Sequence, residues 1–546
     1  MTRPGTLALC ALLALTGVLF NCESIVARSG IQCSSTAECR ARGGPFATSR
    51  CSSDGFCEAI VAPEAGAAVG SACSTSDECR ARLDEPARCV DSTCRPLTLP
   101  ASACSLIGPV ENDDVALLGA LVPQGGAAAT EYGRAHDALR WLVSEWNGRA
   151  QQAGDRTKDV AIVQCDESRL ATTLPHLLAL RPKAIIGPFT SSTFREYIKG
   201  EATEIPTFAP TVDDPLLVEQ PDSRRRVYSC VPNLVTAVKP FQRAAAVVAA
   251  RVAAERESSA AKVVLVKTSD EAEQAFVAAV EQGLELNGQP AAGQATYKAV
   301  SMTTAIHDNG APPLLASAQT VALEKPDVVI LSAGIVAEEL ITDIDTRWPA
   351  LNPTIPLPVF LLLGRYAKLE ESFATNKKST KGRFYALDWT GNATTADNYA
   401  TVVGELLARN ALAGPAAART LDCGFLAIYG ALAGASGANT SMLSVSTQQY
   451  LDGVALATTG SDENTINLKA DTIPKAISLL GAVPPIKTKL AGTINPAIVF
   501  APNGTLAGTA GLYCISSETS TSPRVWTPTG MTFGETGVEN GSIACP

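Results

Sequence analysis

The chain has 546 residues, too many for a single hydrophobic core, and this length favours about three or four structural units. Hydrophobic residues make up 46% and charged residues 18%, so most of the chain can bury a core and is not disordered by composition. The net charge is −10, and residues 224–226 form only a short arginine cluster. Without a long basic stripe, nucleic acid is excluded as an expected partner.

The N-terminus has the features of an exported protein. Sixteen cysteines favour an oxidising compartment, because a cytosol would keep so many thiols reduced. After Arg3, the apolar run over residues 7–20 predicts a signal peptide at 1–21. The run ends in LFNC, which resembles a bacterial lipobox, although Asn21 stands where a small residue is usual. We therefore expect a lipid anchor at Cys22 in the cell envelope, periplasmic or on the outer surface; the alternative is simple secretion, with Cys22 in a disulfide.

Residues 22–110 form a cysteine-rich region with an internal repeat. One copy opens with CSSTAECRAR and the other with CSTSDECRAR, and both contain few large apolar residues. Disulfides are therefore expected to replace a core. A metal site is disfavoured, since C-x5-C is not a usual zinc spacing and no histidine lies nearby. The region is either a stalk or an interaction module. Its repeat cysteines are Cys33, Cys39, Cys51, Cys57, Cys73, Cys79, Cys89 and Cys94.

The remaining cysteines lie in the rest of the chain. Without Cys10 in the signal peptide and Cys22 on lipid, fourteen of the sixteen remain, an even number that suits complete pairing. Beyond the repeats, six cysteines permit fifteen pairings, and the sequence does not select among them. We expect only that Cys514 pairs with Cys545 near the C-terminus. The six are Cys104, Cys165, Cys230, Cys423, Cys514 and Cys545.

From about residue 115, short apolar runs alternate with amphipathic helical stretches, which predicts an α/β fold with parallel sheets covered by helices. An Ala-rich helix is predicted over residues 421–435. Residues 493–515 are predicted to form a hairpin, with Asn503 and Gly504 supplying the positive φ angles of its turn. The expected strands are 116–122, 159–164, 184–187, 207–209, 262–267, 327–332 and 359–363.

An ordered series of segments points to a known family. AIVQCDES is followed by PKAIIGPFTSSTFREYIKGEATEIPTFAPTVDDPLL, with VPQGGAAATEYG before them and VYSCVPN and IVFAPNGTLAGTAGLYCIS after them. Over about residues 111–535 the chain resembles the type I periplasmic binding proteins, especially those serving branched-chain amino acid and amide ABC transporters. The resemblance implies two Rossmann-like lobes with a ligand cleft between them. The implied parts are lobe 1 at 111–235 plus about 391–490, lobe 2 at 236–390 plus about 491–535, and a tail at 536–546.

The first lobe supplies the larger set of candidate ligand-binding residues. Loops after the carboxyl ends of parallel strands converge, and helix N-termini there present unpaired N–H groups. Ser191 and Ser192 in GPFTSS can therefore hold a carboxylate or carbonyl, or they can cap the following helix. The resemblance implies ligand contact by Ser191 and by Thr211, and it places Asp213 at a position where the family pattern lacks a carboxylate. A carboxylate there repels an amino acid's carboxylate and attracts an ammonium or hydroxyl group.

The other candidates follow further strands. Gln124 and Gly125 come after the first strand of the first lobe. In the second lobe, the resemblance aligns cleft loops with Ser332 and Gly334 and with Tyr366. Tyr366 can supply the aromatic surface that the family has elsewhere and this chain lacks there, or it can be a core or rim tyrosine.

No enzyme is expected. The histidines His136, His176 and His307 lack metal-ligand spacing, and no nucleophile elbow or phosphate-binding glycine loop follows a strand. The expected function is therefore capture of a small polar, amino acid-like or amide-like solute, with no cofactor or metal, and an ABC permease as partner. The alternative is a surface sensor or structural envelope protein that uses the same fold, with the cysteine-rich repeats contacting protein or cell wall.

Overall fold

The chain divides into two compact units, Met1–Ser71 and Ala72–Pro546. In the first unit, β1 (Ser49–Cys51) pairs antiparallel with β2 (Cys57–Ala59), which sets Cys51 opposite Cys57. Cys22, Cys33 and Cys39 lie outside the described residues. The computed structural model describes residues 49–51, 57–59, 70–110, 115–125, 128–129, 132–152, 158–199, 204–212, 214, 226–267, 271–302, 313–332, 337–364, 382–390, 393–409, 414–493, 497–500, 504, 506, 509–515, 526–534, 537–543 and 545.

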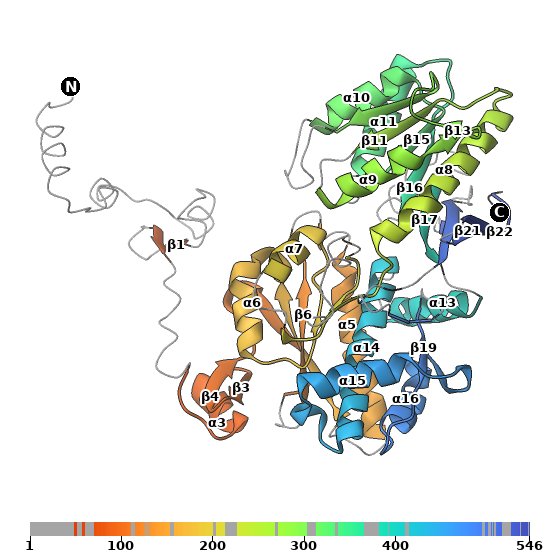
Figure 1. Ribbon diagram of the computed structural model, residues 1–546. Coiled ribbons are helices and arrows are strands. Elements are labelled where there is room, and N and C mark those ends of the chain that lie inside the picture. The colour runs from red at the N-terminus through yellow and green to blue at the C-terminus, as the bar shows by residue number, and fades with distance from the viewer. Residues whose placement is uncertain are drawn as a thin grey trace, which may run out of the picture. The chain divides into compact units, whose positions relative to one another are not determined.

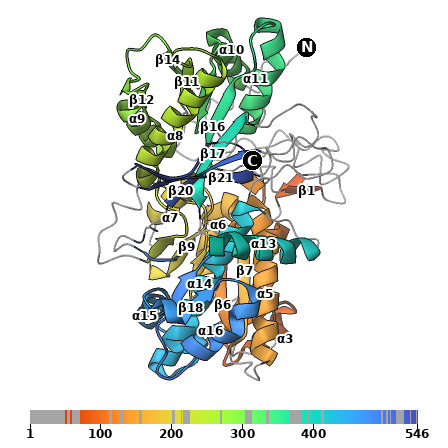
Figure 2. The same cartoon turned by 90° about the vertical axis from the view of Figure 1, so that its right-hand side faces the viewer.

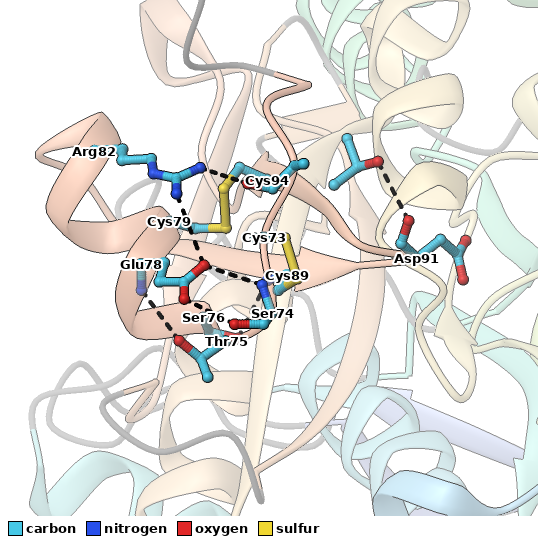
Figure 3. The surroundings of a disulfide bond; sticks show 12 residues. Cys73, Ser74, Thr75, Ser76, Glu78, Cys79, Arg82, Cys89, Asp91 and Cys94 are labelled. Atoms are coloured by element: carbon cyan, nitrogen blue, oxygen red, sulfur yellow. Dashed lines mark hydrogen bonds and ion pairs between the residues drawn. A yellow bond between two sulfur atoms is a disulfide. The ribbon is translucent and has the colours of Figure 1, made fainter.

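The second cysteine repeat is a small disulfide-bonded module (Figure 3). It consists of α3 (Ser76–Leu83) and the hairpin of β3 (Ala87–Val90) and β4 (Thr93–Pro96). Disulfides join Cys73 to Cys89 and Cys79 to Cys94. Its buried hydrophobic cluster is three cysteines and Ala87, which agrees with the expectation that disulfides replace a core here.

This module packs against the α/β domain and is not an isolated spacer. Arg80 donates from Nη1 to the Val110 carbonyl at 2.7 Å, and the buried Arg88 donates to the Val115 carbonyl. Leu97, just after β4, is fully buried in a cluster shared with the first large sheet. This copy of the repeat is therefore held against the α/β domain. After the module come η3 (Pro100–Ser102) and β5 (Cys104–Ile107), the edge strand of the first large sheet, and a disulfide joins Cys104 of β5 to Cys165.

The first sheet has six strands in the order β10-β9-β8-β6-β7-β5, all parallel except β5. Figure 1 labels β6, a central strand of this sheet. Its strands are β6 (Ala116–Val122), β7 (Val160–Asp166), β8 (Ile185–Ile186), β9 (Thr207–Ala209) and β10 (Val227–Ser229). The associated helices are α5 (Arg134–Gln152), η5 (Glu167–Arg169), α6 (Leu170–Ala179), α7 (Ser191–Lys199), α13 (Ala393–Ala408), α14 (Pro415–Ala438), η10 (Met442–Ser444), α15 (Thr447–Thr458), η11 (Asp462–Asn464), η12 (Ala470–Thr472) and α16 (Ile473–Leu480). A parallel pair, β18 (Thr465–Asn467) and β19 (Lys489–Ala491), completes this body.

Alternating side chains of β6 explain why both faces of the first sheet are covered. Leu118 and Ala120 belong to a cluster with α5 and α14, whereas Leu117 and Leu121 belong to a cluster with α6 and Tyr197 of α7. Successive strand residues point to opposite faces, so an all-apolar strand requires a helical layer on each side.

The second sheet has eight strands in the order β14-β11-β15-β16-β17-β20-β21-β22 (Figure 2). From β14 to β17 it is parallel, and beyond β17 it is antiparallel. Its strands are β11 (Val263–Lys267), β14 (Tyr297–Ser301), β15 (Val328–Leu331), β16 (Val359–Leu363), β17 (Phe384–Thr390), β20 (Thr509–Ile515), β21 (Trp526–Gly534) and β22 (Gly537–Asn540). Its helices are α8 (Leu234–Glu255), α9 (Glu271–Gly283), α10 (Pro313–Glu324) and α11 (Ala337–Leu351), with a hairpin of β12 (Glu285–Leu286) and β13 (Gln289–Pro290).

The hairpin predicted over residues 493–515 is wrong. Gly504 has the expected positive φ of 72°, and Phe500 forms an antiparallel bridge with Leu506. However, the Gly504 carbonyl accepts from the Ser229 amide at the edge of the first sheet, whereas β20 pairs with β17 and β21 in the second sheet. The segment is thus shared between two sheets. The region expected to be a tail also contains β22, an edge strand.

Among the described residues, α14 contains a stretch long and apolar enough to cross a bilayer, Ala416–Ala438. The sequence predicted an Ala-rich helix here, over residues 421–435, and no membrane span. Its most apolar window is 89% buried inside the protein, which is what a central core helix requires.

Candidate functional site

Each parallel sheet reverses its strand order at one point, and the candidate residues gather there. In the first sheet, β6 is flanked by β7 on one side and by β8 on the other. In the second sheet, β11 is flanked by β14 and β15 in the same way. Ligands of open α/β sheets bind beyond the carboxyl ends of the strands at such reversals. Gln124 and Ser191 follow β6 and β8, and Ser332 follows β15.

The turn that leads from β8 into α7, residues 188–192, is the centre of the first-lobe site. Thr190 caps α7: its Oγ1 accepts from the Thr193 amide at 3.4 Å, and its carbonyl accepts from the Phe194 amide. The capping role considered for Ser191 and Ser192 therefore belongs to Thr190. Ser191 is half-buried at the first residue of the helix and Ser192 is exposed, which leaves both beside the positive end of the helix dipole.

Thr211 contacts the same turn from β9. Its Oγ1 donates to the Phe189 carbonyl at 2.6 Å, and its side chain is half-buried. The structure thus brings Thr211 and the turn of Ser191 and Ser192 together, as the resemblance implied. Asp213 lies outside the described residues.

Glu167, which was not among the residues predicted from the sequence, is a buried charged group of this site. It follows β7 directly and is 2% exposed. Its carboxylate accepts from the Phe189 amide at 2.6 Å, the Thr190 amide at 3.2 Å and the Thr190 hydroxyl at 2.8 Å. Burial raises the pKa of Glu167 to about 7, against the opposing effect of these hydrogen bonds. Its position at a strand's carboxyl end was the available sequence signal.

The loop after β6 is held from the neighbouring strand. The Gln124 amide donates to Asp166 Oδ1 at 3.2 Å, and the same oxygen accepts from the amide and hydroxyl of Ser168. Gln124 and Gly125 are exposed. Asp166 therefore fixes the backbone while leaving the Gln124 side chain available to a ligand.

In the second lobe, Ser332 is the candidate whose side chain is described. It is 2% exposed, and among the described residues its Oγ has no hydrogen-bond partner. A buried hydroxyl without a partner is costly, so such a group calls for a functional explanation. Gly364, before Tyr366, has a positive φ of 91° and donates to the Leu387 carbonyl. Gly334 and Tyr366 lie outside the described residues.

The chain passes between the two sheets three times, and one turn of α14 anchors all three passages. Cys423 forms a disulfide with Cys230, which follows β10. Arg419 forms an ion pair with Asp388 in β17.

The third anchor is Asp422, which is fully buried and accepts from both the amide and the hydroxyl of Thr493 after β19, at 2.7 and 2.9 Å. The sequence analysis missed Arg419, Asp388 and Asp422, because no local pattern reveals partners so far apart in the chain.

Among the described residues, no cluster of metal-binding side chains lies at this site. Cys73, Cys79 and Cys94 form the only close cluster of potential metal ligands within the described ranges, and all three sulfurs are in disulfides. His136 lies in α5 with Nδ1 2.8 Å from Gln164 Oε1, and His176 lies in α6, where burial lowers its pKa. His307 is outside the described residues.

No protein-family model matches the chain, and no curated protein matches it. Solved structures do match. A branched-chain amino acid ABC transporter ligand-binding protein from Burkholderia xenovorans aligns at a TM-score of 0.50 and 12% identity, covering 77% of this chain and 96% of that one. A branched-chain amino acid transporter substrate-binding protein from Streptococcus pneumoniae, in complex with isoleucine, aligns at 0.49 and 13%, covering 76% and 99%. A solute-binding protein from R. palustris, in complex with benzoate, aligns at 0.47 and 15%, covering 78% and 96%.

At such identities the likeness concerns the fold. Two parallel sheets with reversed strand order, three passages between them and the alignment to the Burkholderia xenovorans protein agree with one another. The described part of this chain therefore has the α/β fold of the type I periplasmic binding proteins, as its sequence resemblance implied.

Proposed function

We propose that this chain is an extracytoplasmic solute-binding protein, lipid-anchored at Cys22, that captures a small polar ligand by closing two lobes. One observation supports this proposal above the others. In each sheet, a polar residue follows a strand beside the point where the strand order reverses: Ser191 follows β8, and Ser332 follows β15. A pair of facing sheets can enclose a solute only if each contributes binding groups at this edge.

The first lobe offers donors suited to a carboxylate or carbonyl. Ser191 and Ser192 begin α7, where backbone N–H groups and the helix dipole favour negative charge. The isoleucine and benzoate of the structural neighbours both carry a carboxylate. Asp213 lies two residues after Thr211 in the sequence, and we propose that it faces the ligand, which would then also carry an ammonium or hydroxyl group.

The second lobe offers Ser332, whose buried hydroxyl lacks a partner within the described part of the chain. A polar group of the ligand could form a hydrogen bond with this hydroxyl. Because the free protein already bears the free-energy cost of burying the hydroxyl without a partner, the new hydrogen bond would favour binding. Gly334 and Tyr366 are proposed to complete the lining.

Closure requires a hinge, and the passages anchored on α14 supply one. Few segments connect the two sheets, so a change in their backbone angles can turn one lobe against the other. A ligand that contacts both lobes binds the closed state preferentially and shifts the population toward it. We propose that lobe 1 comprises residues 111–235 plus about 391–490 and lobe 2 the remainder of the fold, with residues 497–506 packed on lobe 1.

Delivery of the solute to an ABC permease, without chemical change, completes the proposal. The site has a buried acid in Glu167 and several hydroxyls, and Glu167 accepts from two backbone amides and from the hydroxyl of Thr190, the residue that caps α7. Acid–base catalysis needs a group within reach of the substrate's proton.

The second candidate is a sensor or structural envelope protein. It is favoured by the packing of the second cysteine repeat against the first sheet, because a rigidly held module can present a fixed surface to another protein. Solute binding distinguishes the two candidates.

A thermal-shift screen of amino acids, amides, aromatic acids, sugars and short peptides tests solute capture. Stabilisation follows RT ln(1 + [L]/Kd), so a micromolar ligand at millimolar concentration contributes about 4 kcal/mol. Solute capture predicts a clear rise in Tm for one chemical class. A Tm unmoved by every class supports the second candidate instead.

A further inference from the structure

We propose that Glu167 is the positioning residue of the turn at residues 188–192, holding the turn's backbone in the conformation that presents Ser191 and Ser192 to a ligand. The ligand-presenting part of this inference rests on the proposed solute-binding function. The positioning part rests on the contacts of the folded chain alone.

Glu167 reaches the turn across the end of a strand. It follows β7, whereas the turn follows β8, and β6 lies between these two strands in the sheet. The Glu167 carboxylate therefore links the loops on both sides of the strand-order reversal. Gly187 lets the turn begin close to β6, because a Cβ there would lie 2.2 Å from the Leu121 carbonyl oxygen.

The three hydrogen bonds to Glu167 decide which amides remain for a ligand. The amides of Phe189 and Thr190 donate to the carboxylate, and the Thr193 amide donates to Thr190 Oγ1. The amides of Ser191 and Ser192 also lie in the first turn of α7, where N–H groups have no partner within the helix, and we infer that they are the donors left for a ligand. The Glu167 carboxylate thus binds the amides at the start of the turn of residues 188–192, next to the sheet.

The position of Glu167 also makes the order of the turn depend on pH. Burial raises the pKa of Glu167 to about 7, and the nearby charge of Asp166, which is itself paired with Arg169, acts in the same direction. If the turn opens and Glu167 becomes solvated, its pKa returns toward 4.5. The hydrogen-bonded conformation of the turn is therefore most stable, relative to the open conformation, below pH 4.5. This extra stability is lost as the pH rises through 7.

Hydrogen–deuterium exchange of the segment 188–193, measured in the whole protein at pH 5 and pH 8 and corrected for intrinsic rates, tests this inference. For the wild type we expect protection to be lower at pH 8 by about 10-fold or more. Glu167→Gln cannot ionise, so its protection should not differ between the two pH values. Glu196→Gln, on the exposed face of α7, is the matched control and should behave as the wild type does.

Equal protection of the wild-type segment at both pH values would overturn the inference. This measurement uses the wild type alone, so it does not depend on whether Glu167→Gln folds. A pH dependence that persists in Glu167→Gln would overturn it as well. Titration with isoleucine and benzoate separates the two proposals. If the exchange behaves as expected and no solute of the screen binds, solute capture fails and the positioning role stands. If a solute binds and the exchange does not respond to pH or to Glu167→Gln, the positioning role fails.

Discussion

Arg419 of α14 and Asp388 of β17 form an ion pair in which the side chains are 16% and 2% exposed. This pair joins the helix at the core of the first lobe to a strand of the second sheet. Because Asp388 is almost completely buried, the neighbouring Arg419 cation stabilises its charge. One turn of α14 therefore contacts all three chain segments that connect the lobes. Its contacts are this ion pair, the hydrogen bonds between Asp422 and Thr493, and the Cys230–Cys423 disulfide.

Arg419→Met should therefore destabilise the protein. The substitution removes the Arg419 cation from the buried pair, and breaking a buried pair in this way costs about 3 kcal/mol of unfolding free energy. Urea denaturation measures the loss. Lys489→Met, which breaks the exposed pair with Asp462, is the control and should cost less than about 1 kcal/mol. Equal losses in the two variants would show that the α14 pair does not stabilise the connection.

Ser332→Ala should separate stability from binding. The variant removes a buried hydroxyl that has no partner within the described ranges, so the unfolding free energy should stay the same or rise by about 1 kcal/mol. The affinity for the solute identified by the thermal-shift screen should fall, because the ligand loses this contact. Calorimetric titration and urea denaturation provide the two readouts. A loss of stability with unchanged affinity would assign Ser332 to the core.

Ser191→Ala should weaken solute binding and leave the fold intact. The serine lies at the start of α7 but does not cap it, since Thr190 does, so the helix should not lose stability. One uncharged hydrogen bond contributes about 1 kcal/mol, which corresponds to about a fivefold rise in Kd. Ser478→Ala, on the exposed side of α16, serves as the control. Unchanged affinity in calorimetry would exclude Ser191 from the site.

The double variant Cys73→Ser, Cys89→Ser should unfold the cysteine module before the rest of the chain. The bond closes a loop of 16 residues, for which the chain-entropy contribution is about 3 kcal/mol, and the module has no substantial apolar core to compensate. Limited proteolysis should cut within residues 72–96 while the α/β domain remains intact. Resistance equal to that of the wild type would show that packing against the first sheet is sufficient.

Stability should fall as the pH rises from 4.5 to about 7, because Glu167 has a higher pKa when folded than when unfolded. The two values differ by 2.5, the difference between about 7 and 4.5, and this corresponds to about 3 kcal/mol. Denaturation curves across this range should show a shallower dependence for Glu167→Gln than for the wild type. Identical curves would mean that Glu167 titrates normally in the folded protein.

Much of the fold could be predicted from the sequence, because continuous apolar runs bounded by polar turns identify buried parallel strands. The predictions of 116–122, 207–209 and 359–363 coincide with β6, β9 and β16. Pairing between distant segments was harder to predict. The turn at Gly504 was identified, but nothing local showed that the strand after it joins β17 and not its own neighbour.

The candidate site shows the same division. The GPFTSS loop and Thr211 follow strands and converge as expected, and Cys514 pairs with Cys545. Glu167 was missed, because its role depends on amides 22 and 23 residues away. Thr190 was missed as the cap, because four hydroxyl residues in a row, Thr190 to Thr193, leave the first helical residue ambiguous from sequence.

Small-angle X-ray scattering before and after addition of the solute that gives the largest thermal shift tests the central claim most directly. Closure of two lobes around a ligand predicts a smaller radius of gyration at saturation and a return to the starting value when the solute is removed. A radius of gyration that is unchanged at saturating solute would contradict capture by hinge closure.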